Sequence, residues 1–200
     1  MCRSWRHTVT DLVKIFISAM LIENIVLMRF LGLCPFIGMS TNLKKSTGMG
    51  VAVLFVTVLA TAVTWPLYNG ILVPFKLEFL KILVFILVIA SLVQLVEFYL
   101  KKTAPALYSS MGVYLALITT NCAILAVTFD VIIKGYSFIE SLVYAIGVAC
   151  GFFLSLVLLA GIRERLKIAP VPAFLKGMPI LFVAAGLLSM AFGGFEGLIK

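Results

Sequence analysis

Two cysteines stand where apolar stretches of the chain are interrupted. Cys34 is followed by Pro35 in the segment 30–36 (FLGLCPF), and Cys122 follows three polar residues in the segment 117–122 (LITTNC). Proline lacks a backbone N–H and disfavours helical geometry in the residue before it. Polar side chains in an apolar span are costly unless they form hydrogen bonds, for example with backbone groups left unpaired where a helix is broken. The sequence therefore predicts an interrupted helix at each cysteine, with the first break at the Cys34–Pro35 step.

Thiolates at two matched interruptions have the chemistry of metal ligands. Iron–sulfur clusters are held by cysteine thiolates, usually four. If Cys34 and Cys122 face each other, they supply two of the four, and a homologous partner has to supply the others. The alternative is that each is a small hydrophobic side chain, as free cysteines usually are. Cys150, in the run GVACG, has the surroundings of close helix packing, and Cys2 lies near the terminus with no expected role.

A second set of polar residues lies in the same two stretches and forms a candidate ion path. Its members are Glu23, Asn24, Thr119, Thr120 and Asn121. An ionisable side chain well inside a span is by default a functional hypothesis. The alternative for Glu23 is that it pairs with a cation of a neighbouring helix or subunit. Arg29 lies six residues beyond Glu23, which is not the same helix face.

The composition places these residues in a membrane. Of the 200 residues, 63% are hydrophobic and 12% charged, and the mean hydropathy is +1.20, whereas about a quarter of the residues in a soluble domain are charged. A span needs about 20 apolar residues. Stretches of about that length are 12–39, 48–75, 79–100, 103–129, 141–162 and 177–195. We predict an all-α integral membrane protein with six transmembrane helices, of which the first and fourth are interrupted.

The six predicted spans divide into two halves, 1–100 and 101–200, within a single transmembrane domain. Because three spans is an odd number, the second half enters the membrane with opposite topology, which is the layout of an inverted repeat. Basic residues cluster in short loops near residues 44, 101 and 163, and such clusters mark the cytoplasmic side. Both termini are then expected on the outer face. The first residues, with two arginines, are interpreted as part of a retained first helix rather than a cleaved signal peptide.

Several functional classes find no support in the sequence. The net charge of +8 fits the basic loops of a membrane protein, and no basic–aromatic stripe predicts nucleic-acid binding. The chain has no phosphate-binding loop, no GxGxxG after a strand and no HExxH. Its single histidine, His7, excludes haem held by a pair of histidines within this chain. We expect no complete active site in this chain alone.

Three motifs, in order along the chain, resemble a known family. They are 30–36 (FLGLCPF), 118–123 (ITTNCA) and 160–166 (AGIRERL), and 184–189 (AAGLLS) also fits. Over nearly its whole length the chain resembles the family of membrane proteins that includes the A subunit of the Rnf complex, an ion-translocating ferredoxin:NAD oxidoreductase. The E subunit of the sodium-pumping NADH:quinone oxidoreductase is a close relative. The Cys34–Pro35 step favours the Rnf branch.

The resemblance implies a cofactor, partners and a function. Family members have six helices in two inverted halves and pair with a homologous subunit of opposite topology, the E subunit in Rnf. Each member of the pair gives two cysteines to one [2Fe–2S] cluster, and by motif these are Cys34 and Cys122 here. The other implied partners are the Rnf subunits B, C, D and G, in the inner membrane of a bacterium. The implied function is electron relay through this cluster, coupled to translocation of Na⁺ or H⁺.

A secondary carrier is the alternative function. Inverted repeats and broken helices are also typical of transporters. The candidate ion path would then line a site for an ion or a small solute, without a redox cofactor. Iron in the purified complex would separate the two hypotheses.

Overall fold

All regular elements in the described part of the chain are helices. The computed structural model describes residues 2–40, 43–73, 80–103, 118, 121–170, 172 and 175–196. Within this part, the helices long and apolar enough to cross a membrane are Ser46–Leu72, Lys81–Phe98 and Phe138–Leu166, and shorter apolar helices cover Cys122–Ile133 and Met178–Gly194. These apolar helices confirm the prediction of an all-α membrane protein.

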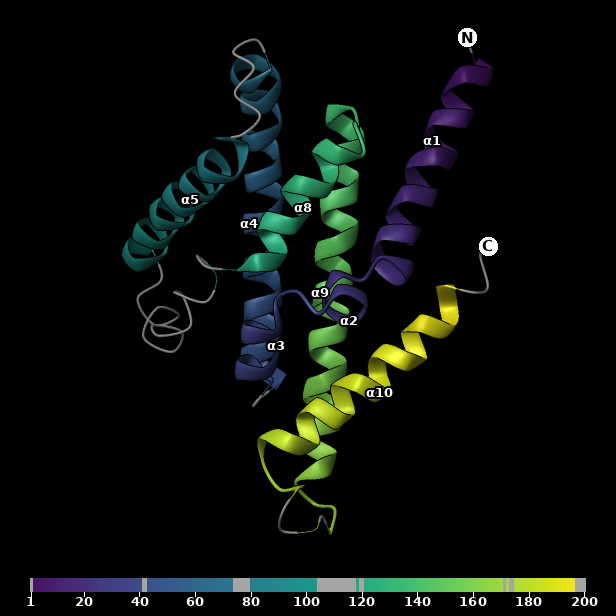
Figure 1. Ribbon diagram of the computed structural model, residues 1–200, viewed down its shortest axis with the longest axis vertical. Helices are drawn as coiled ribbons and strands as arrows, with labels where there is room; N and C mark the ends of the chain where they lie inside the picture. Colours follow the sequence, from purple (N-terminus) through teal and green to yellow (C-terminus); the bar gives the residue numbers. More distant parts are fainter. Residues whose placement is uncertain are drawn as a thin grey trace.

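Helices α4 and α9 form the centre of the molecule. Helix α4 (Leu43–Leu67) continues into a π-helical turn, η2 (Tyr68–Leu72), and α9 covers Phe138–Leu166. The two helices pack along each other in opposite directions, and α5 (Lys81–Thr103) lies beyond α4 on the outside (Figure 1). Most of the α5 window remains unburied, so this helix presents its apolar side chains outward.

The first apolar stretch is divided into short helical segments. They are α1 (Cys2–Ile17), the π-helical η1 (Ser18–Ile22), α2 (Ile25–Arg29) and α3 (Leu33–Met39). The chain leaves helical geometry first at Glu23 and Asn24. It does so again at Phe30 and Gly32, whose φ angles of 55° and 80° are left-handed. Glycine adopts such angles without the steric cost that a Cβ brings.

The second of these breaks lies within the predicted segment 30–36, but at its start and not at the Cys34–Pro35 step. We expected it at the Cys34–Pro35 step, but both residues are helical and belong to the first turn of α3. The first N–H groups of a helix have no partner within the helix, so the missing N–H of Pro35 costs little at this place. The left-handed residues Phe30 and Gly32 make the break instead.

In the second half, a helix begins at the second cysteine. Helix α8 spans Cys122–Ile133, and Asn121 before it is extended, with φ −76° and ψ 109°. Residues 104–117 and 119–120, and with them Thr119 and Thr120 of the candidate ion path, lie outside the described residues. The last helix, α10 (Met178–Glu196), crosses the molecule obliquely beside α9 and α2 (Figure 1).

Helix α8 extends beyond the predicted end of its span at residue 129. The sequence placed Asp130 in a connecting loop, but the helix continues to Ile133 and Asp130 is only 8% exposed. A charged residue can lie there because it has an ion-pair partner and a hydrogen-bond partner, described below.

Glycines allow the central helices to approach their neighbours closely. A Cβ on Gly147 of α9 would lie 2.9 Å from the carbonyl oxygen of Phe16, and one on Gly151 would lie 2.7 Å from that of Met20. Cys150 between them is half-buried. The GVACG run therefore serves close helix packing, as its composition predicted.

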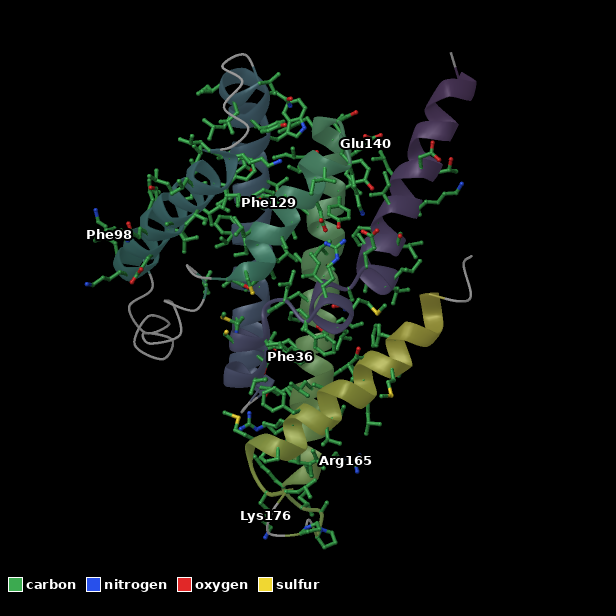
Figure 2. The ribbon with its side chains drawn as sticks, viewed as in Figure 1. Phe36, Phe98, Phe129, Glu140, Arg165 and Lys176 are labelled. Carbon is green, nitrogen blue, oxygen red and sulfur yellow. The ribbon has the colours of Figure 1, made fainter. Side chains whose placement is uncertain are left out.

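Two of the basic segments, at the start of α4 and the end of α9, lie toward one end of the molecule. Helix α4 begins and α9 ends there (Figure 1). Arg165 and Lys176 lie at this end, whereas Glu140 lies toward the opposite one (Figure 2). Helix α5 ends on the side of the molecule, away from the end of α9 (Figure 1). The fold thus brings the start of α4 and the end of α9 toward one end of the molecule, and the predicted orientation in the membrane stays a prediction.

Candidate cofactor site and charged network

Cys122 lies against the second break of the first apolar stretch. It is the first residue of α8, and its Sγ accepts a hydrogen bond of 2.9 Å from the backbone N–H of Gly32, 90 residues earlier in the chain. Asn121 caps the helix, because its Oδ1 accepts from the N–H of Ala123 at 3.0 Å.

Glycine at position 32 is required for space as well as for conformation. A Cβ there would lie 3.1 Å from the Cβ of Ala123, and 3.2 Å from both the Oδ1 of Asn121 and the ring of Phe152. The turn that leads to Cys34 is therefore packed directly against the start of α8.

Helix α3, which carries Cys34, is fixed at its far end by an arginine of α9. The Nη1 of Arg163 donates to the carbonyl oxygen of Ile37 at 3.2 Å and to the Oγ of Ser40 at 3.0 Å. Carbonyl groups at the end of a helix have no partner within the helix, and a guanidinium group can satisfy them. The sequence predicted only a basic cluster here, whereas the structure gives Arg163 a role in holding the helix of Cys34.

The two thiols make an incomplete metal site. Cys34 and Cys122 are both free and exposed. Among the described residues, no group of three or more histidine, cysteine, aspartate or glutamate side chains could hold a metal ion. Thiolates are soft ligands that suit iron–sulfur clusters and zinc, each of which takes about four such ligands. Cys34 and Cys122 can therefore hold a metal centre only together with ligands from another chain or from residues outside the described part.

Glu23 belongs to a charged network that surrounds the first break. It ends η1 and pairs with Lys134, the residue that ends α8. The hydroxyl of Tyr144 lies 3.1 Å from a carboxylate oxygen of Glu23 and 3.1 Å from one of Asp130. The Nζ of Lys134 also lies 4.6 Å from the centroid of the Tyr144 ring. Glu23 is thus paired with a cation of another helix, which was the alternative to an unpaired ion-path residue.

The second ion pair of the network joins α2 to α8. The Nη1 of Arg29 donates to the two carboxylate oxygens of Asp130 at 2.7 and 2.9 Å. Each carboxylate of the network therefore has its own cation, and Tyr144 bridges the two pairs. Pairing of opposite charges lowers the cost of placing ionisable groups among apolar helices.

Two asparagines of the candidate ion path cap helices. The Oδ1 of Asn24 accepts from the N–H groups of Val26 and Leu27, and its Nδ2 donates to the carbonyl oxygen of Gly151 at 3.0 Å. Asn121 caps α8 in the same way, but its buried Nδ2 has no hydrogen-bond partner among the residues that the structure describes.

Sequence reasoning missed four members of the charged network. These are Arg29, Asp130, Lys134 and Tyr144. Their signal in the sequence is only that ionisable groups lie in or next to apolar stretches. The pairing depends on contacts between residues about 100 positions apart, which periodicity and spacing do not encode.

Comparison with known proteins agrees with the three motifs. A family model described as "Rnf-Nqr subunit, membrane protein" matches residues 12–199. This chain belongs to the Rnf-Nqr family. The match covers both the segment with Cys34 and the segment with Cys122.

Curated relatives of the Rnf-Nqr family align over nearly the whole chain. The A subunit of the ion-translocating oxidoreductase complex of Syntrophotalea carbinolica is 53% identical, over 94% of this chain and 98% of its own length. The A subunit of the Na⁺-translocating ferredoxin:NAD⁺ oxidoreductase complex of Acetobacterium woodii is 51% identical, over 94% and 97%. The A subunit of the proton-translocating ferredoxin:NAD⁺ oxidoreductase complex of Clostridium ljungdahlii is 49% identical, over 93% and 96%.

Proposed function

We propose that this chain is the A-type membrane subunit of an ion-translocating ferredoxin:NAD oxidoreductase complex, in which it relays electrons across the membrane. Relatives of that name match nearly the full length of both chains. The observation that carries the proposal is the hydrogen bond from Gly32 to the sulfur of Cys122. It sets one exposed thiol beside the turn that leads to the other, Cys34.

Cys34 and Cys122 are proposed to hold half of a [2Fe–2S] cluster. The donor set fits, because cysteine sulfurs are the usual ligands of such clusters, and the sulfur of Cys122 already accepts an N–H of the kind that tunes cluster sulfurs. The described residues add no third ligand. The remaining two ligands are therefore assigned to a homologous subunit of opposite topology, like the E subunit of Rnf. When bound, the cluster supplies one-electron transfer within the membrane.

The residues around the two thiols fix their relative position. Gly32 leaves the room that brings the α3 turn against α8, Asn121 sets the start of α8, and Arg163 holds the end of α3. Because α3 and α8 come from different halves of the chain, a shift of one against the other changes the separation of Cys34 and Cys122. A change of one charge in a low-dielectric site is poorly screened, so such a shift can respond to the redox state.

The coupled ion is proposed to pass near the first break, at Glu23. The support is the network of Glu23, Tyr144 and Asp130 at this interruption, since paired ionisable groups inside spans mark ion paths. The polar residues that complete the proposed path are Asn24, Thr119, Thr120 and Asn121. Glu23→Gln is expected to lower the number of ions moved per NADH formed, measured in vesicles that contain the complex. An unchanged ratio would remove Glu23 from the path.

For the whole chain we propose six transmembrane helices in two inverted halves, 1–100 and 101–200, in the bacterial inner membrane. The antiparallel pair α4 and α9, one from each half, supports this layout, as do the helix starts near Cys34 and Cys122. The basic end of the molecule is assigned to the cytoplasm and both termini to the outer face. Reporter fusions at Lys101 and Lys200 test this, and a cytoplasmic signal at Lys200 contradicts it.

The proposal is tested on the complex purified through a tag on this chain. We expect a brown preparation with iron, an electron paramagnetic resonance (EPR) signal of a [2Fe–2S] cluster, and co-purification of E-like and other subunits equivalent to B, C, D and G of Rnf. A colourless preparation without iron would instead favour the carrier. The relatives described above are all named as oxidoreductase subunits, which favours the electron relay.

A further inference from the structure

A buried amide nitrogen next to Cys122 has no hydrogen-bond partner in the described part of the chain. The side chain of Asn121 belongs to a residue that is only 5% exposed, and its Oδ1 is used by the N–H of Ala123. Among the buried side-chain nitrogen and oxygen atoms of the described residues, its Nδ2 is the one without a hydrogen-bond partner. A buried donor without an acceptor costs about 1–3 kcal/mol, so this nitrogen calls for an acceptor that binds here.

The position of Asn121 limits what that acceptor can be. Its Oδ1, on the same amide as the Nδ2, is within 3.2 Å of the place where a Cβ of Gly32 would be. The N–H of Gly32 in turn lies 2.9 Å from the sulfur of Cys122. The unpaired donor therefore lies in the immediate surroundings of a sulfur that already accepts one N–H. An anionic sulfur bound beside Cys122 is an acceptor that a neighbouring amide N–H can serve.

A second asparagine shows that the cap alone does not leave the amide unpaired. Asn24 also caps a helix with its Oδ1, but its Nδ2 donates to the carbonyl oxygen of Gly151 at 3.0 Å. The capping role of Asn121 is served by its oxygen alone, as a serine could do. The amide nitrogen is thus the part of Asn121 to which no described residue of this chain gives a partner.

We propose that Asn121 is a positioning residue whose Nδ2 donates a hydrogen bond to an anionic sulfur of the iron–sulfur cluster at Cys122. This inference rests on the cluster of the proposed function. Hydrogen bonds to cluster sulfurs stabilise the more negative, reduced form, and in a low-dielectric site this effect is large. Asn121 therefore raises the midpoint potential of the cluster and fixes its orientation relative to α8.

The test is a redox titration of the intact complex, followed by EPR. Asn121→Ser keeps a capping oxygen and removes the amide, and it is expected to lower the midpoint potential and shift the g-values. Asn121→Asp keeps the shape and adds a negative charge, so it is expected to lower the potential further. Thr61→Val removes a buried hydroxyl that donates to the carbonyl oxygen of Thr57 in the same helix, α4, and the midpoint potential is expected to stay at the wild-type value.

The possible outcomes distinguish failure of the role of Asn121 from failure of the proposed function on which it rests. A wild-type potential and g-values in Asn121→Ser, with the signal intact, overturn the role of Asn121 alone. If the Asn121→Ser complex loses its EPR signal, the test is made on the Asn121→Asp complex. A midpoint potential unshifted from the wild type in that variant overturns the proposed role of Asn121. If Cys122→Ser leaves the signal of the wild-type complex unchanged, the cluster assignment fails and this inference fails with it.

Discussion

The guanidinium of Arg29 and the carboxylate of Asp130 form an ion pair that joins the first interrupted stretch to α8. One guanidinium nitrogen lies 2.7 and 2.9 Å from the two carboxylate oxygens, across 101 residues of sequence. The side chain of Asp130 is 11% exposed and that of Arg29 is 47% exposed. Removal of one partner from such a pair leaves an uncompensated charge, which costs more than the pair itself contributes.

We predict that Asp130→Asn destabilises the purified complex by about 1–2 kcal/mol. This is below the ~3–5 kcal/mol of a fully buried pair, because solvent screens part of Arg29. The double variant Arg29→Gln with Asp130→Asn should be more stable than the sum of the two single changes, by a coupling of about 1 kcal/mol. Thermal denaturation in detergent measures this, with Asp11→Asn on the exposed face of α1 as the control. Strict additivity would show that the two residues do not interact.

Tyr144→Phe isolates the bridge between the two ion pairs. The change keeps the ring against Tyr136, 5.5 Å away between centroids, and removes the hydroxyl from Glu23 and Asp130. We expect a loss of about 1–2 kcal/mol in stability and fewer ions moved per NADH formed. Vesicle assays of transport and NAD reduction measure the ratio, with Tyr136→Phe as the matched control. Equal ratios in both variants would make the bridge purely structural.

The apolar helices were predictable from the sequence because their signal is local. Apolar stretches of span length became α4 with η2, α5, α9 and α10, with ends a few residues from those expected. The motifs around Cys34 and Cys122 also led to the correct family.

The detailed site was not predictable from spacing alone. The break before Cys34 depends on left-handed Phe30 and Gly32, and proline, the stronger sequence signal, is tolerated where a helix begins. The end of α8 was misplaced because Asp130 was counted as a loop charge, when a partner 101 residues away allows it inside a helix.

Close packing of α9 against the first stretch makes two glycines irreplaceable. We predict that Gly151→Ala destabilises the complex by about 1–3 kcal/mol, because the new methyl group would lie 2.7 Å from the carbonyl oxygen of Met20, and backbone cannot yield as a side chain does. Gly147→Ala should act alike. Gly161→Ala on the same helix meets nothing within 4 Å and should be neutral or slightly stabilising. Equal thermal stability of all three variants would contradict the close approach.

A chain that supplies two thiolates cannot complete a four-thiolate cluster. We predict that this subunit, purified alone as a monomer, holds little or no [2Fe–2S] cluster, whereas co-expression with the homologous subunit restores it. Iron and sulfide analysis of the two preparations measures the difference. Stoichiometric cluster in the monomer would contradict the shared site.

The cysteines themselves give the sharpest contrast. Serine is nearly isosteric with cysteine but is a much poorer soft ligand for iron, so Cys34→Ser and Cys122→Ser should each abolish the cluster signal and electron flow to NAD, while the complex still assembles. Cys150 is half-buried between two packing glycines, where a serine can bond its own helix backbone, so Cys150→Ser should keep signal and activity. EPR and ferredoxin-driven NAD reduction on the three purified variants provide the readouts. General damage to the membrane domain would not single out two cysteines of three. Retention of both signal and activity in Cys34→Ser and Cys122→Ser would show that the two thiols are not ligands.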